Sequence, residues 1–140
     1  MISKIFKIFI LLFFFTNNLF ANNQYYQEGL NLYKSKKFNE AKFKFEQDIV
    51  YNPKNEMSYL YLSKIFKKLD NVDLAEQNLN TVILLNPQNE EAIYNLARLK
   101  LDSSDYEQSK KLNKRLLSLC KKFCEKSKKL KIEIDSLSKK

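Results

Sequence analysis

The chain repeats with a fixed period of 34 residues, and this period constrains its fold more than any other feature. Its only two prolines lie in two copies of Asn-Pro-x-Asn-Glu, at residues 52–56 and 86–90. Aligning residues 22–55 with 56–89 pairs Tyr25 with Tyr59, Lys34 with Lys68, Ala41 with Ala75 and Ile49 with Ile83. A constant period of this length is typical of solenoids, in which each repeat packs against the next.

Each repeat contains two helical patterns. In the second repeat, apolar residues recur every three or four positions on either side of the polar pair Asp70-Asn71, so two amphipathic helices joined by a tight turn are expected. Small residues stand where the two helices would touch: Gly29, Ser63 and Ala97 in the first helices, and Ala41, Ala75 and Ser109 in the second. Glycine inside a helix costs about 1 kcal/mol relative to alanine. Gly29 therefore indicates a close approach of the two helices.

The two proline segments are predicted to separate the repeats. Proline has no N–H and disfavours helix in the residue before it, so Pro53 and Pro87 each end a second helix. Asn55 and Asn89 then offer side-chain oxygens to cap the next helix, and a glutamate follows each of them in its first turn. These segments are therefore expected to be turns and not binding motifs.

Taken together, these positions resemble the tetratricopeptide repeat (TPR) family, whose pattern is W-x2-L-G-x2-Y, then A-x3-F, then P. In the first helix of each repeat, the large position holds Tyr25, Tyr59 and Ile93, the small position holds Gly29, Ser63 and Ala97, and the Tyr position holds Leu32, Phe66 and Lys100. In the second helix, the Ala and Phe positions hold Ala41 with Phe45, Ala75 with Leu79, and Ser109 with Asn113. The closing proline position holds Pro53, Pro87 and Lys121. The resemblance covers residues 22 to about 123. It implies an all-α, right-handed superhelix of about three TPR helical hairpins.

The predicted organisation follows from the period. The three repeats occupy residues 22–55, 56–89 and 90–123. The last is degenerate at Lys100, Asn113 and Lys121, as terminal repeats often are because one of their faces meets solvent. Residues 124–140 are expected to form an amphipathic capping helix, and the apolar stripe that it presents holds Phe123, Leu130, Ile134 and Leu137.

The first 21 residues predict a secretory signal peptide. Lys4 and Lys7 precede the apolar run IFILLFFF, and a polar stretch then closes on Ala21, after which cleavage is expected. The alternative is an uncleaved membrane anchor, but the run is shorter than the roughly 20 residues that span a bilayer. The mature protein is therefore expected outside the cytoplasm, in the periplasm or secreted.

Composition argues against catalysis. The chain has no histidine and a single glycine, which removes the commonest general base and metal ligand and the Gly-rich phosphate loops. Glu90-Glu91 offers a carboxylate pair, but two acids complementing a helix N-terminus explain it better. We expect no enzyme activity, no cofactor, no metal, no small-molecule substrate and no nucleic-acid partner. We do not take the net charge of +9 as evidence of a function, because heavy use of Lys, Asn, Ile and Phe is also typical of AT-rich genomes.

The only two cysteines, Cys120 and Cys124, lie where the last repeat gives way to the capping helix. A structural disulfide is favoured in an oxidising compartment. Two free packing thiols are the main alternative, and redox or metal chemistry comes last because the C-x-x-C context of redox motifs is missing. A bridge on one continuous helix would be strained, so a disulfide predicts a break near residue 121.

The TPR resemblance implies a concave groove lined by the first helices. Of the positions that it places there, the strongest candidates are Tyr26, Leu30, Tyr33, Lys34, Met57, Leu60, Lys64, Lys67, Tyr94 and Arg98. The resemblance also places the acids Glu91 and Asp102 in the groove. This aromatic, apolar and net basic mixture suits a peptide with some acidic character. A carboxylate clamp of Lys64, Asn95 and Arg98 is disfavoured, because Leu30 stands where that clamp has Asn.

The predicted function is that of an exported scaffold or chaperone-like adaptor that binds a protein partner through this groove. Envelope assembly and cytochrome maturation both fit, and the sequence does not choose between them. The alternative is a peripheral membrane-associated envelope protein that uses the lysine-rich C-terminal helix, KSKKLKIEIDSLSKK.

Overall fold

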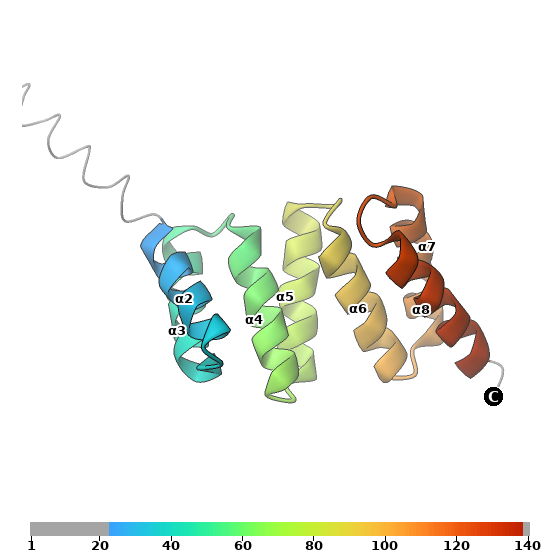
Figure 1. Ribbon diagram of the computed structural model, residues 1–140, viewed down its shortest axis with the longest axis horizontal. Coiled ribbons are helices and arrows are strands. Elements are labelled where there is room, and N and C mark those ends of the chain that lie inside the picture. The colour runs from blue at the N-terminus through green and yellow to red at the C-terminus, as the bar shows by residue number, and fades with distance from the viewer. Residues whose placement is uncertain (1–22, 139–140) are drawn as a thin grey trace, which may run out of the picture. The chain divides into compact units, whose positions relative to one another are not determined.

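The computed structural model describes residues 23–138, and all regular elements in this range are helices (Figure 1). They are α2 (Gln24–Lys34), α3 (Phe38–Tyr51), α4 (Glu56–Lys68), α5 (Val72–Leu85), α6 (Glu90–Asp102), α7 (Tyr106–Leu119) and α8 (Cys124–Leu137). The predicted signal peptide and its cleavage site at Ala21 lie outside the described residues. Within residues 23–138, no helix has both the length and the apolar character needed to cross a bilayer.

The Asn-Pro segments separate the helices as predicted. The second helix of a hairpin ends two residues before each proline, α3 at Tyr51 and α5 at Leu85. Asn89 Oδ1 accepts a hydrogen bond from the Ala92 N–H at 2.9 Å, and Asn55 Oδ1 accepts one from the Met57 N–H at 3.2 Å. Each asparagine therefore satisfies an N–H that the first turn of the next helix leaves without a partner.

The described residues form two compact units that divide between Ser58 and Tyr59, and we describe each by itself. In the first unit, α2 packs against α3 around Ala41 and Phe45, which are fully buried. A Cβ atom added to Gly29 would lie 2.9 Å from Cε1 of the Phe45 ring. The close approach predicted at Gly29 is confirmed, and the group that needs the space is an aromatic side chain.

A buried carboxylate holds the turn that follows α3. Asp48 is fully buried and accepts hydrogen bonds from Asn52 Nδ2 at 3.1 Å, Asn55 Nδ2 at 2.6 Å and Ser58 Oγ at 2.5 Å. Because a buried carboxylate is tolerated only when its oxygens are satisfied, these three donors and Asp48 form one interdependent cluster. The cluster ties α3 to the start of α4.

In the second unit, α8 packs on both α6 and α7. Its core cluster holds Ala97, Leu101, Leu130 and Ile134, with Leu137 packed against it. The apolar stripe predicted for the capping helix is therefore confirmed at its three leucine and isoleucine positions. The opposite face of α8 carries the lysines and the exposed Ile132.

The degenerate positions of the third repeat have specific partners. Asn113 is only 2% exposed; its Nδ2 donates to the Ser127 carbonyl at 3.0 Å and its Oδ1 accepts from Ser127 Oγ at 2.6 Å. Lys100 Nζ pairs with Glu76 Oε1 at 2.6 Å, which links α6 to α5. The expectation that these positions face solvent is wrong for Asn113, which instead docks α8 onto α7. Lys121 is exposed in the turn between α7 and α8.

The helix breaks between the two cysteines. α7 ends at Leu119, Cys120 takes a left-handed conformation with φ 32° and ψ 67°, and α8 begins at Cys124. The two sulfur atoms lie at bonding distance, 2.14 Å, with the Cα atoms 4.9 Å apart. The structure thus has the break expected near residue 121, and it places the two sulfur atoms at bonding distance.

Candidate functional site

Four of the five predicted groove residues of the first unit lie on one helix. Tyr26, Leu30, Tyr33 and Lys34 are spaced at three and four residues along α2, which places them on one face. The Tyr26 ring packs against Phe45 with centroids 5.9 Å apart, and Tyr33 packs edge-on against Phe38 at 5.5 Å. The two tyrosines are therefore half-buried and held in place. Met57 is half-buried in the first turn of α4.

Leu60 is not a surface residue. Its side chain is 1% exposed, and buried positions occupy most of the circumference of α4: Ser58, Leu60, Leu62, Ser63, Ile65 and Phe66. The prediction that Leu60 offers an apolar contact to a ligand is therefore wrong, because this position is part of the core. The lysines that α4 leaves at least partly accessible in the second unit are Lys64, Lys67 and Lys68.

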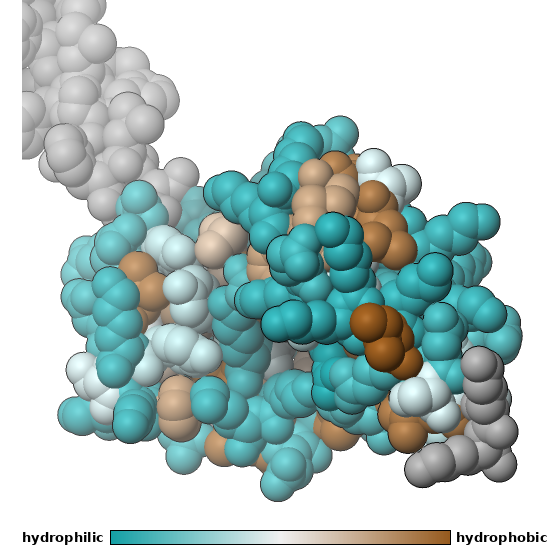
Figure 2. All heavy atoms as spheres, turned by 45° about the vertical axis from the view of Figure 1, so that its right-hand side comes forward, coloured by the Kyte–Doolittle hydropathy of each residue, from teal (hydrophilic) through white to brown (hydrophobic). Residues whose placement is uncertain are grey.

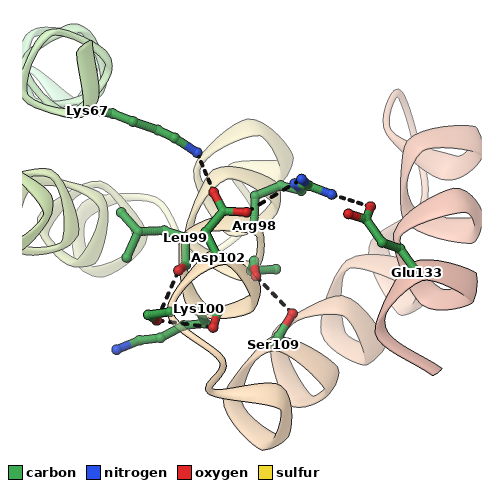
Figure 3. Close-up of polar contacts among 9 residues, drawn as sticks. Lys67, Arg98, Leu99, Lys100, Asp102, Ser109 and Glu133 are labelled. Carbon is green, nitrogen blue, oxygen red and sulfur yellow. Dashed lines mark hydrogen bonds and ion pairs between the residues drawn. The ribbon is translucent and has the colours of Figure 1, made fainter. Parts of the chain in front are cut away.

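The basic groove residues of the second unit are joined to carboxylates in a ladder of ion pairs. Lys64 Nζ lies 2.7 Å from Glu91 Oε1, and Lys67 Nζ lies 2.9 Å from Asp102 Oδ2. Figure 3 shows Arg98 between two acids, Asp102 on its own helix and Glu133 on α8. We call the set Lys64, Lys67, Glu91, Arg98, Asp102 and Glu133 the charged face; it joins α4, α6 and α8.

An aromatic pair lies next to this ladder. The ring of Tyr94, on α6, packs against Phe123 with centroids 5.5 Å apart. Lys126 Nζ lies 5.6 Å from the centroid of Tyr94 and 4.5 Å from that of Phe123, which is cation–π distance for both rings. The first turn of α8 therefore lies against Tyr94, one of the predicted ligand contacts.

The charged face is balanced. Its three cations are matched by three carboxylates, and every one of these side chains is between 24% and 52% exposed. The net basic character expected of the groove is therefore absent from this face. Exposed ion pairs contribute only about 0–1 kcal/mol each. A ligand carrying its own charges can replace the internal partners at small cost.

Glu90 has a role that its position in the sequence did not indicate. Although it belongs to the first turn of α6, its carboxylate accepts hydrogen bonds from three consecutive N–H groups, those of Lys121, Lys122 and Phe123. The residue is 8% exposed. Burial by itself raises the pKa of Glu90, but the three backbone donors outweigh it, so the pKa lies below its ordinary value of 4.5. Glu90 thus holds the turn that leads into α8.

This depressed pKa predicts a pH-dependent stability. A carboxylate whose pKa is lowered in the folded state stabilises it above the pKa of the unfolded chain, and that contribution is lost as the pH falls through the folded value. We expect Glu90→Gln to lower the Tm by several degrees at neutral pH. The difference from wild type should shrink as the pH falls below about 4.5. Thermal unfolding of both proteins across this range measures it, and a difference independent of pH would contradict the role given to Glu90.

Of the three acids of the charged face, Glu91 and Asp102 were expected in the groove from their family positions and Glu133 was not, but none of their ion pairs was predicted, although the sequence carries a signal for two of these pairs. Lys67 and Asp102 are 35 residues apart, and so are Arg98 and Glu133. This separation is one period plus one position, so each pair joins equivalent places on successive first helices. Opposite charges at this offset would have identified both contacts. The pair of Lys64 and Glu91 does not have this 35-residue separation.

Comparison with solved structures shows the fold. The first TPR domain of Spaghetti (RPAP3), bound to the HSP90 peptide SRMEEVD, superposes with a TM-score of 0.74 at 20% identity, covering 88% of this chain and 94% of that one. The Yersinia enterocolitica type III secretion chaperone SycD, in complex with a peptide of the translocator YopD, gives 0.76 at 18%, with 86% and 95% covered. The TPR2B domain of yeast Sti1, in a complex with pHsp70, gives 0.77 at 13%, with 83% and 97% covered.

These similarities establish an all-α fold of TPR helical hairpins, as the 34-residue period predicted. No protein-family model matches the sequence. No curated protein matches it either.

Proposed function

We propose that the protein is an exported, non-catalytic adaptor that holds a segment of a partner protein against the charged face of α4, α6 and α8. The observation that carries the proposal is the ladder itself, in which accessible cations and carboxylates alternate next to an aromatic pair. Such a surface offers exchangeable charges for orientation and fixed rings for contact area. Two of the solved structures that it resembles are TPR proteins bound to peptides, which supports a protein ligand.

The ligand that fits best is an extended segment with acidic side chains. Lys64, Lys67 and Arg98 are the donors that it would use, and Glu91 and Asp102 are the groups that it would displace. The HSP90 peptide bound by the RPAP3 domain, SRMEEVD, has more acidic than basic residues, so this fold accommodates ligands of that kind. Tyr94 supplies a ring whose position is fixed by Phe123.

The proposal that the protein is exported rests on residues 1–21, in which a positively charged start is followed by an apolar run and then by a small residue. A cysteine pair at bonding distance is consistent with an oxidising compartment such as the periplasm. In that compartment the adaptor would hold client or assembly segments, and both envelope assembly and cytochrome maturation supply such segments. No catalytic group is needed for this role.

Binding to selected peptides tests the proposal. A display library of short random peptides is screened against the purified chain, and the dissociation constants of the enriched peptides are measured by titration. We expect enrichment of acidic sequences. Arg98→Gln should weaken binding about tenfold, because a charge-assisted hydrogen bond contributes roughly 1.5–3 kcal/mol.

Lys100→Gln is the matched control. Lys100 is on the same helix and also forms an ion pair, but its partner is Glu76 on α5 and it is not part of the charged face. Its removal should leave the affinity within a factor of two. Equal losses for the two variants, or enrichment of basic peptides, would contradict the proposed face.

A further inference from the structure

The positive charge of the chain is concentrated in one region. Residues 106–138 contain ten Lys or Arg and four Asp or Glu, whereas residues 23–105 contain eleven and twelve. Of the four acids, Glu133 pairs with Arg98 and Glu125 with Lys128. A compositional bias toward lysine would affect the whole chain, so the asymmetry indicates a local function. The excess lies on α7, α8 and the turn between them.

A cleft between α7 and α8 lies in this region. It has a volume of about 270 Å³ and is lined by Lys110, Asn113, Lys114, Leu117, Lys131, Ile134 and Asp135. Three of these residues are lysines, and Asp135 is the only carboxylate. Among the described residues none of the three lysines forms an ion pair. The cleft is therefore cationic at its rim, with aliphatic side chains among its lining.

The α8 helix also carries an exposed apolar residue. Ile132 follows Lys131 on α8 and is 71% exposed. Figure 2, which turns this side of the molecule forward, shows a few apolar groups within a largely hydrophilic surface. Exposed lysines and an exposed isoleucine on one helix give the combination by which peripheral proteins bind lipid, with cations at the headgroups and an aliphatic group below them.

The use of lysine in place of arginine indicates the chemical class of the ligand. The chain has two arginines, and both are engaged, Arg98 with acids of the charged face and Arg115 with the Pro87 carbonyl. Arginine is preferred for fixed, bidentate recognition of a carboxylate, whereas lysine is a hydrated point charge on a flexible stem. A surface of lysines therefore suits mobile phosphate headgroups better than the ordered carboxylates of a protein partner.

We infer that the α7–α8 face, defined by Lys110, Lys114, Lys131 and Ile132, binds a lipid surface that carries anionic phosphate headgroups. This site is separate from the charged face. The adaptor would then hold its protein partner while docked on a membrane. The two ligands, an acidic peptide and an anionic lipid, both require cations, and they would use two different sets of basic side chains.

Vesicle co-sedimentation tests the inference. The probes are vesicles of phosphatidylcholine alone and of phosphatidylcholine with phosphatidylglycerol, at low and moderate salt. The full chain should bind the anionic vesicles and not the neutral ones. Because each lysine near an anionic surface changes the partition coefficient about fivefold, Lys110→Gln, Lys114→Gln and Lys131→Gln together should lower it roughly a hundredfold. Circular dichroism checks that the variant keeps its helices.

Two matched controls make the test specific to this face. Lys36, Lys37 and Lys54 are exposed in the first unit, so changing these three to Gln removes the same charge elsewhere and should lower partitioning only a few fold. Ile132→Ser should weaken binding severalfold, whereas Leu84→Ser, at an even more exposed apolar position on α5, should not.

Three results would overturn the inference. They are failure of the wild-type chain to bind anionic vesicles, equal losses for the two triple variants, and binding of poly-glutamate in place of vesicles, which would indicate an acidic protein surface. None of these results affects the proposed peptide site, because lipid binding and peptide binding depend on different residues. Arg98→Gln is accordingly expected to leave vesicle binding unchanged. The two claims therefore fail separately.

Discussion

Replacing Asp48 with valine is expected to destabilise the chain by about 2–4 kcal/mol, because it removes the acceptor of three hydrogen bonds. Ser58 is fully buried, so its hydroxyl would lose its partner without gaining water. The side chains of Asn52 and Asn55 would also lose the contact that fixes the turn before α4. Urea unfolding followed by circular dichroism measures the loss.

The chain contains its own control for this experiment. One period later, Val82 replaces Asp48 and Ala92 replaces Ser58, and both are fully buried. The double variant Asp48→Val with Ser58→Ala copies that apolar pair, and replacing both partners by apolar groups can be nearly neutral. We expect it to recover about 1–2 kcal/mol relative to Asp48→Val alone. If the double variant is no more stable than the single one, the buried cluster is not what Asp48 contributes.

Gly29→Ser is expected to cost about 1–3 kcal/mol, although serine is the better helix former. The added Cβ would lie 2.9 Å from the Phe45 ring, and Phe45 is fully buried, so the ring has no free space to move into. Thermal and urea unfolding of the variant provide the measurement. A variant as stable as wild type would show that the ring yields easily.

The second repeat again supplies the compensating pair. Ser63 and Leu79 stand at the positions equivalent to Gly29 and Phe45, and both are buried. Phe45→Leu alone should destabilise the chain by leaving a cavity. Combined with Gly29→Ser, it should give a total loss smaller than the sum of the two single losses by about 1 kcal/mol, because the residues are in contact. Strict additivity would contradict the contact.

Much of the fold could be predicted because its signals are local or periodic. The spacing of apolar residues indicated the helices, and the lone glycine indicated where two of them touch. Pro53 and Pro87 act through their own rings and missing N–H groups, so their effect on α3 and α5 needs no knowledge of the rest of the chain. A break near Cys120 was predicted on the condition that the two cysteines form a bridge, because a bridge within one continuous helix would be strained.

The polar groups inside the protein could not be predicted in the same way. Asp48 and Asn113 occupy places in a helical pattern that a surface residue could also take, and only the packed structure shows that their partners are Ser58 and Ser127. Leu60 was assigned to the groove by family position, but it is buried. Burial at a given position depends on neighbouring helices and not on the repeat pattern alone.

The candidate site was predicted in part. The sequence identified the cations of the charged face and two of its acids, but not the ion pairs between them, since opposite charges on different helices meet only when the helices are packed. Glu133 is the clearest case, because it was counted as a residue of the tail and its partner is Arg98. That pairing changes the expected chemistry from a basic groove to a balanced face whose internal acids compete with the ligand.

The affinity of acidic peptides for Glu91→Gln tests the central claim most directly. Glu91 neutralises Lys64 at 2.7 Å, so removing its charge leaves Lys64 available to a carboxylate of the ligand. If acidic segments bind on this face, Glu91→Gln should bind the selected peptides several fold more tightly than wild type, and Glu76→Gln, whose partner is Lys100, should bind as wild type does. Weaker binding by Glu91→Gln, or no difference between the two variants, would contradict the account.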